Sequence, residues 1–162
     1  MAAGSGFYSP MIGSRSTAAA IAIMWSGAAA GQTCTGTPSP VRLFVNVENV
    51  ASSDGLIAVT LYADDRSRFL ARRGSLYVGR VPARAGTTRV CIHLPSTGVW
   101  ALAAYHDADG NRSLARSGLG LPREGYGFSN NAPAMIGLPS FRRVRLSVPR
   151  NNMTTSVRLR YP

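Results

Sequence analysis

The feature that most constrains the fold of this chain is a hydrophobic pattern with a period of two. From residue 41 to 48, valine and leucine alternate with arginine, phenylalanine, asparagine and glutamate, and a similar alternation runs from 143 to 161. Such alternation places successive side chains on opposite faces of an extended strand, one buried and one solvated. Beyond the first thirty residues we find no run with the 3.6-residue spacing of an amphipathic helix. The pattern predicts an all-β chain.

Seven strands are expected, because the alternating or apolar runs cover residues 41–47, 56–62, 76–81, 88–94, 99–106, 143–148 and 153–161. The turn sequence ASSDG follows the first run, and PSTG follows the fourth. These turns predict two hairpins, one between the first and second runs and one between the fourth and fifth. The spacing predicts an antiparallel β-sandwich of immunoglobulin-like or transthyretin-like type with one long loop. A small β-barrel is the alternative.

The N-terminal segment has the features of a secretory signal peptide. Arg15 precedes the apolar run TAAAIAIMW, and three alanines that end at Ala30 supply a cleavage signal. The apolar run is shorter than the roughly 20 residues of a membrane-spanning helix. We therefore expect export to the periplasm or the cell exterior, with no membrane span after cleavage. The expected organisation is a signal peptide (1–30), an N-terminal arm (31–40) and a single β-sandwich domain (41–162).

The chain has two cysteines, Cys34 and Cys91. In an oxidising compartment an isolated pair of cysteines usually forms a disulfide. This disulfide is expected to join the N-terminal arm to the body of the domain. The alternative is a pair of free thiols, and two cysteines alone do not define a metal site.

The charge balance is strongly basic, with 18 basic against 7 acidic residues and a formal net charge of +11. All of the basic residues are arginine, which a GC-rich coding sequence favours, and they are scattered along the chain from Arg15 to Arg160. Scattered charge is typical of a solvated surface, whereas a polyanion site needs a cluster. We expect weak, non-specific binding of anions and no specific nucleic-acid partner.

A long segment without clean periodicity follows the fifth run, and long loops in compact domains often carry function. It contains YHDADGN at 105–111, LGLPREGYGFSNN at 119–131 and GLPSF at 137–141. This succession closely resembles an exported bacterial family, the domain of unknown function 2141 family, from about residue 41 to 161. The family has no assigned activity, so the resemblance implies no function beyond export.

Three oxygen-bearing residues, Asp107, Asp109 and Asn111, occupy alternate positions in this segment. The first three ligands of a calcium-binding loop have the same spacing. However, Arg112 stands where such a loop has glycine, and Gly118 occupies the twelfth position, where an EF-hand has glutamate. The two interpretations are a polar Asx-type turn, which the departures favour, and a calcium site. Calcium is the one cofactor that the pattern suggests.

His106 lies beside Asp107, and a hydroxyl such as Ser129 or Ser140 would complete a hydrolytic triad. The sequence has no G-x-S-x-G motif of a nucleophile elbow. Alternation also places His106 on the same face as Trp100 and its apolar neighbours, which predicts a buried structural histidine. An enzyme is therefore the less favoured interpretation.

Two aromatic residues, Tyr126 and Phe128, flank a glycine in the long segment. They can form a platform for a sugar ring or a peptide, or a plug over one end of the sandwich. We favour the plug, in which Asn130 and Asn131 hydrogen-bond the backbone of their own loop.

These observations favour a non-enzymatic binding or accessory module of the cell envelope. The 105–131 loop is its expected recognition surface for an unidentified protein, peptide or glycan. One alternative is a calcium-dependent or hydrolytic enzyme centred on His106, Asp107 and Asp109, and another is a purely structural envelope protein. A sandwich fold is compatible with all three. The candidate ligand-binding residues are Tyr105, His106, Glu124, Tyr126, Phe128, Asn130 and Asn131.

Overall fold

The computed structural model describes residues 1, 3–4, 6, 33–119, 122–134 and 138–162. Residues 31–162 form one compact unit. The expected signal peptide falls almost entirely outside the described residues. No helix of the described part is long and apolar enough to cross a lipid bilayer.

The described part of residues 31–162 consists of eight strands and two short helical turns. In chain order they are β1 (Val41–Val50), β2 (Leu56–Ala63), β3 (Tyr77–Pro82), β4 (Gly86–Leu94), β5 (Gly98–Asp107), β6 (Tyr126–Phe128), the 3-10 turn η1 (Ser129–Asn131), α1 (Phe141–Val144), β7 (Leu146–Val148) and β8 (Met153–Arg158).

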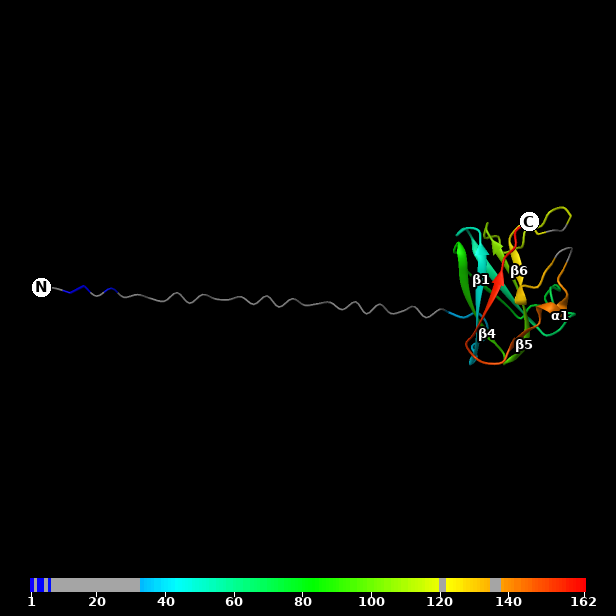
Figure 1. Ribbon diagram of the computed structural model, residues 1–162, viewed down its shortest axis with the longest axis horizontal. Coiled ribbons are helices and arrows are strands. Elements are labelled where there is room, and N and C mark those ends of the chain that lie inside the picture. Colours follow the sequence, from blue (N-terminus) through cyan, green and yellow to red (C-terminus); the bar gives the residue numbers. More distant parts are fainter. Residues whose placement is uncertain (2, 5, 7–32, 120–121, 135–137) are drawn as a thin grey trace. The chain divides into compact units, whose positions relative to one another are not determined.

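The strands form two sheets that pack face to face. One sheet has the order β4-β1-β8, and the other has the order β3-β2-β5-β6, with β7 also paired to β5. In Figure 1, β1 and β4 lie to the left, and β5 and β6 lie to the right. The β1–β8 pair is parallel and the other strand pairs are antiparallel. The predicted β-sandwich is confirmed, and the described strands do not close into a barrel.

The core between the sheets follows directly from the period-two pattern. Alternate residues of each strand point inward, and burial of their apolar surface is the main force that holds the sheets together. Leu43, Val45 and Val47 of β1 and Ile57, Val59 and Leu61 of β2 are fully buried in this core.

The two predicted hairpins are wrong. Strand β1 pairs with β4 and β8, whereas β2 pairs with β3 and β5, and β4 and β5 likewise belong to different sheets. At the end of β1 the register shifts between Glu48 and Val50, and Asn49 and Gly55 have positive φ angles of 61° and 64°. The chain therefore crosses from one sheet to the other. Alternation specifies which face of a strand is buried, but it does not specify the neighbouring strand.

The predicted disulfide between Cys34 and Cys91 is present. Backbone hydrogen bonds support it: the Thr35 N–H donates to the Cys91 carbonyl at 2.9 Å, and the His93 N–H donates to the Thr35 carbonyl at 2.8 Å. Thr35 also forms an isolated parallel bridge with Ile92. The described part of the N-terminal arm is thereby fixed to β4.

Candidate functional site

The outer face of the larger sheet carries aromatic side chains. In the β5–β6 pair, Ala103 lies opposite Phe128, and Tyr105 lies opposite Tyr126. Residues opposite each other in an antiparallel pair project from the same face of the sheet. The inward residues of β5 belong to the core between the sheets, so these four side chains lie on the other face. Tyr62 of β2 projects from this outer face as well.

A second, smaller apolar cluster covers part of this face. Phe69 makes edge or tilted ring contacts with Tyr62 at 5.2 Å, Phe128 at 6.1 Å and Phe141 at 5.6 Å between ring centroids. Tyr126 contacts the Phe128 ring at 6.0 Å. The two predicted loop aromatics therefore pack on the sheet face as strand β6, and they do not plug the end of the sandwich. A strand of three residues is too short to produce a recognisable period.

A cavity of about 600 Å³ lies between the outer sheet face and the β5–β6 connection. Its floor includes the small side chain of Ala103 between larger aromatic residues. Burial raises the pKa of both Tyr62 and Tyr105 above the ordinary range of a phenol. The cavity is lined on the sheet by Tyr62, Ala103, Tyr105, Tyr126 and Phe128, and on the connection by Leu114, Arg116, Leu119 and Pro122.

The described part of the β5–β6 connection, which we call the 108–125 loop, has internal hydrogen bonds. The Arg123 N–H donates to the Ala115 carbonyl at 2.8 Å. The Glu124 carboxylate accepts the N–H of Ala108 at 3.2 Å and that of Ala115 at 2.9 Å. Glu124 therefore joins the beginning, the middle and the end of the loop. The loop is built as one wall of the cavity.

At the end of β5 the structure brings three carboxylates together. One oxygen from each of Asp107, Asp109 and Glu124 lies within 4.8 Å of the others. Asp107 is fully buried; its Oδ2 accepts the Arg112 N–H at 2.8 Å, and its Oδ1 has no hydrogen-bond partner in the described structure. Two of the three predicted metal ligands thus meet Glu124, which we predicted only as a ligand-binding residue.

The third predicted metal ligand, Asn111, lies in the same turn. Its Nδ2 donates to Asp109 Oδ2 at 2.7 Å, and its Oδ1 accepts the Ser113 N–H at 2.7 Å. Arg112 has a φ angle of 64°, in the left-handed region that glycine adopts most easily. The backbone therefore adopts a left-handed conformation at Arg112 although the residue is not glycine.

The structure does not assemble the hydrolytic triad. His106 is 2% exposed; its Nε2 lies 2.9 Å from the Asp54 carbonyl and its Nδ1 lies 3.0 Å from the Tyr161 hydroxyl. Since a carbonyl only accepts, Nε2 donates to Asp54, and Nδ1 shares a hydrogen bond with the Tyr161 hydroxyl. Both ring nitrogens are therefore used in structural hydrogen bonds.

The predicted nucleophile Ser129 lies elsewhere. Its hydroxyl accepts the Leu102 N–H at 3.0 Å and donates to the Val144 carbonyl. Leu102 and His106 are four residues apart on one strand, or about 13 Å. Ser129 thus joins η1 to β5 and α1.

Asn130 and Asn131 bond other segments of the chain and not their own loop. The Asn130 Nδ2 donates to the carbonyls of Arg143 and Arg145, and Asn131 Oδ1 accepts the Arg158 N–H at 2.7 Å. The predicted role in the backbone of their own loop is wrong. A turn motif does not reveal which distant backbone it meets.

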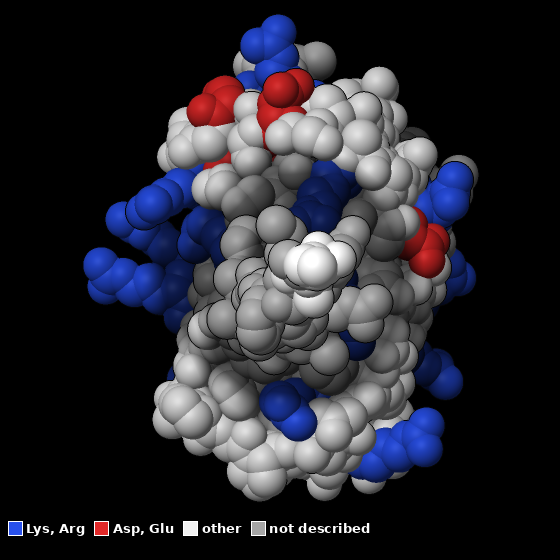
Figure 2. Space-filling view, turned by 90° about the vertical axis from the view of Figure 1, so that its left-hand side faces the viewer, with Lys and Arg blue, Asp and Glu red and all other residues white. Residues whose placement is uncertain are grey.

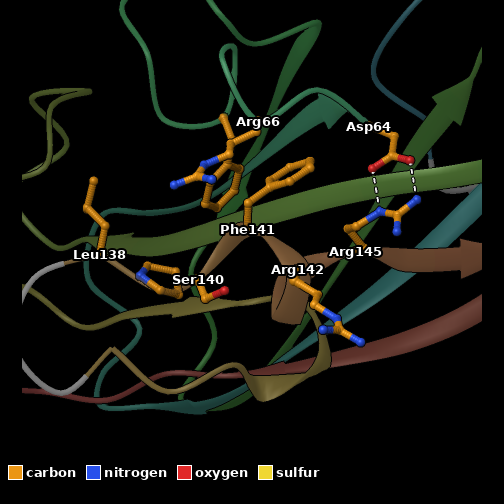
Figure 3. A pocket seen from close by; sticks show the side chains of 9 residues that line it. Asp64, Arg66, Leu138, Ser140, Phe141, Arg142 and Arg145 are labelled. Carbon is orange, nitrogen blue, oxygen red and sulfur yellow. Dashed lines mark hydrogen bonds and ion pairs between the residues drawn. The ribbon is translucent and has the colours of Figure 1, made fainter.

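A second hollow of about 750 Å³ lies beside α1 (Figure 3). There Arg145 forms a two-point ion pair with Asp64, with nitrogen–oxygen distances of 2.7 and 2.6 Å, which lowers the pKa of that carboxyl group. The head groups of Arg66 and Arg142 lie on opposite sides of Phe141 in this view. These cations do not converge on one anion, so this hollow is the weaker candidate site.

The arginines also form no single patch on the face shown in Figure 2, where they lie at several separate places, both at the outline and within it. This distribution is the one that we expect of a solvated basic surface.

A model of the domain of unknown function 2141 family, described as an uncharacterized protein conserved in bacteria, matches residues 45–156. The chain belongs to this family. The match runs from β1 to β8, so the cavity and the 108–125 loop lie inside the family domain. No curated protein and no solved structure matches the sequence.

Proposed function

We propose that this member of the family is an exported, non-enzymatic binding module of the bacterial cell envelope. Its binding site is the cavity between the outer face of the larger sheet and the 108–125 loop. The observation that carries this proposal is the cavity itself, with a volume of about 600 Å³ and an aromatic floor. Ligand sites in proteins are concave, mostly apolar and typically about 300–1,000 Å³ in volume.

The lining indicates which part of a ligand enters the cavity. Tyrosine rings and leucine and proline side chains favour an aliphatic or aromatic group, and Arg116, which also lines the cavity, favours a polar or negatively charged group beside it. A hydrophobic side chain of a peptide has this chemistry.

Binding of the apolar dye anilinonaphthalene sulfonate to the purified protein tests the proposal. Ala103 is half-buried and lines the cavity, so Ala103→Phe places a phenyl ring inside it and blocks part of the space that the dye would occupy. We expect this substitution to weaken dye binding at least tenfold, which corresponds to about 1.4 kcal/mol. The measurement is a fluorescence titration.

The matched control is Ala85→Phe, which adds the same side chain at an exposed position of the chain between β3 and β4. It should leave the affinity of the cavity for the dye unchanged. Equal dye binding by both variants and the unchanged protein would refute the cavity as the binding site.

A further inference from the structure

We propose that Asp107, Asp109 and Glu124 bind a calcium ion, which closes the base of the 108–125 loop. The three residues come from the end of β5, the turn that follows it and the segment before β6. The ion therefore bridges the first and last parts of the loop. This inference is independent of the ligand cavity, because the ion site is tested without any dye or ligand.

The spacing of the three carboxylates suits one ion. Calcium–oxygen distances are about 2.3–2.6 Å, so two ligands of one calcium ion lie no more than about 5 Å apart. The ligand oxygens of Asp107, Asp109 and Glu124 all lie within 4.8 Å of one another. One ion can therefore contact all three with little movement of the backbone.

The buried carboxylate of Asp107 provides an independent reason to expect a cation. Its side chain is 0% exposed, and Oδ1 has no hydrogen-bond partner among the residues that the structure describes. A buried charge is costly unless it is paired or coordinates a metal. Since the Arg112 N–H already occupies Oδ2, Oδ1 is the atom that a cation would satisfy.

The donor set favours calcium over other metals. All three side chains offer carboxylate oxygens, which hard cations prefer, and calcium accepts irregular geometry with six to eight oxygen ligands. Magnesium demands nearly ideal octahedral geometry, and zinc prefers nitrogen and sulfur. Arg112 and Gly118 depart from a high-affinity loop, so we expect a dissociation constant of about 0.1–1 mM, the range of weak extracellular sites.

Thermal unfolding of the purified protein tests this site. With about 10 mM calcium chloride in place of EDTA, the midpoint should rise by about 5–10 °C, because the ion binds the folded state. Asp107→Asn and Glu124→Gln should each abolish the rise. The control is Glu48→Gln, which removes one carboxylate from the other sheet. This variant should retain the calcium-dependent rise.

Two site variants are used because one of them could fail to fold. Glu124 is only partly buried, so Glu124→Gln serves if Asp107→Asn does not fold. In EDTA, Asp107→Asn should be at least as stable as the unchanged protein, because it removes the unpaired buried charge. An equal midpoint in calcium and EDTA would overturn the proposal, as would a calcium shift that survives both substitutions. A shift produced by magnesium but not by calcium would overturn the choice of metal.

Discussion

Replacement of both Cys34 and Cys91 by serine should lower the free energy of unfolding by about 4 kcal/mol. The disulfide joins residues 57 positions apart in the sequence, and it restricts the unfolded chain much more than the folded one. In the chain-entropy model a loop of this length gives about 4 kcal/mol at 25 °C. The folded state should keep its sandwich, because the arm also holds β4 through backbone hydrogen bonds of Thr35.

Guanidinium chloride unfolding measures this effect. The midpoint should fall in the double serine variant, and reduction of the unchanged protein with dithiothreitol should produce a similar fall. Dithiothreitol should not change the unfolding midpoint of the double variant, which has no disulfide and therefore serves as the control for the reductant. If the midpoints of the oxidised protein and the double variant coincide, the disulfide does not stabilise this fold.

Phe128→Ala should lower the free energy of unfolding by about 3–5 kcal/mol, the usual loss when a buried phenylalanine is truncated. Phe128 is 7% exposed and packs between Phe69 and Tyr126. Its loss opens a hole in the cluster that covers the sheet, and it also removes part of the cavity floor. Dye binding should therefore weaken together with stability.

Two further variants separate these effects. Phe44 lies on the smaller sheet, partly exposed, with Arg89 Cζ 4.3 Å from its ring centroid, and Phe44→Ala should cost only about 1 kcal/mol. Phe128→Leu fills most of the hole that Phe128→Ala leaves. Compared with Phe128→Ala, it should recover more of the lost free energy of unfolding than of the lost affinity for the dye. A loss of stability in Phe128→Ala no greater than that in Phe44→Ala would contradict the role of the second cluster.

The sequence was a good guide to the strands because each buried face repeats every two residues. It was a poor guide to their partners, since β1 and β2 satisfy the same pattern in different sheets. One signal for the covered outer face was present: the run LIAVTLY in β2 is apolar at nearly every position, and both of its faces are buried. A continuous apolar strand indicates a sheet that is covered on both sides.

The candidate site was only partly predictable for a related reason. The spacing of Asp107 and Asp109 marked a local turn, and local spacing can be read from the sequence. The approach of Glu124 depends on how a long loop returns to the sheet, which the spacing does not specify. The position of Leu114 in the cavity wall could not be predicted for the same reason, because it also depends on the path of the loop. The burial of His106 was predicted correctly because it follows from strand alternation alone.

The most direct test of the proposed binding site is to locate the bound dye by nuclear magnetic resonance. We predict intermolecular nuclear Overhauser effects between anilinonaphthalene sulfonate and the side chains of Tyr105, Tyr126 and Leu114, which meet across the cavity. Contacts confined to Arg142 beside α1, or to Phe44 on the smaller sheet, would place the dye elsewhere and contradict the account.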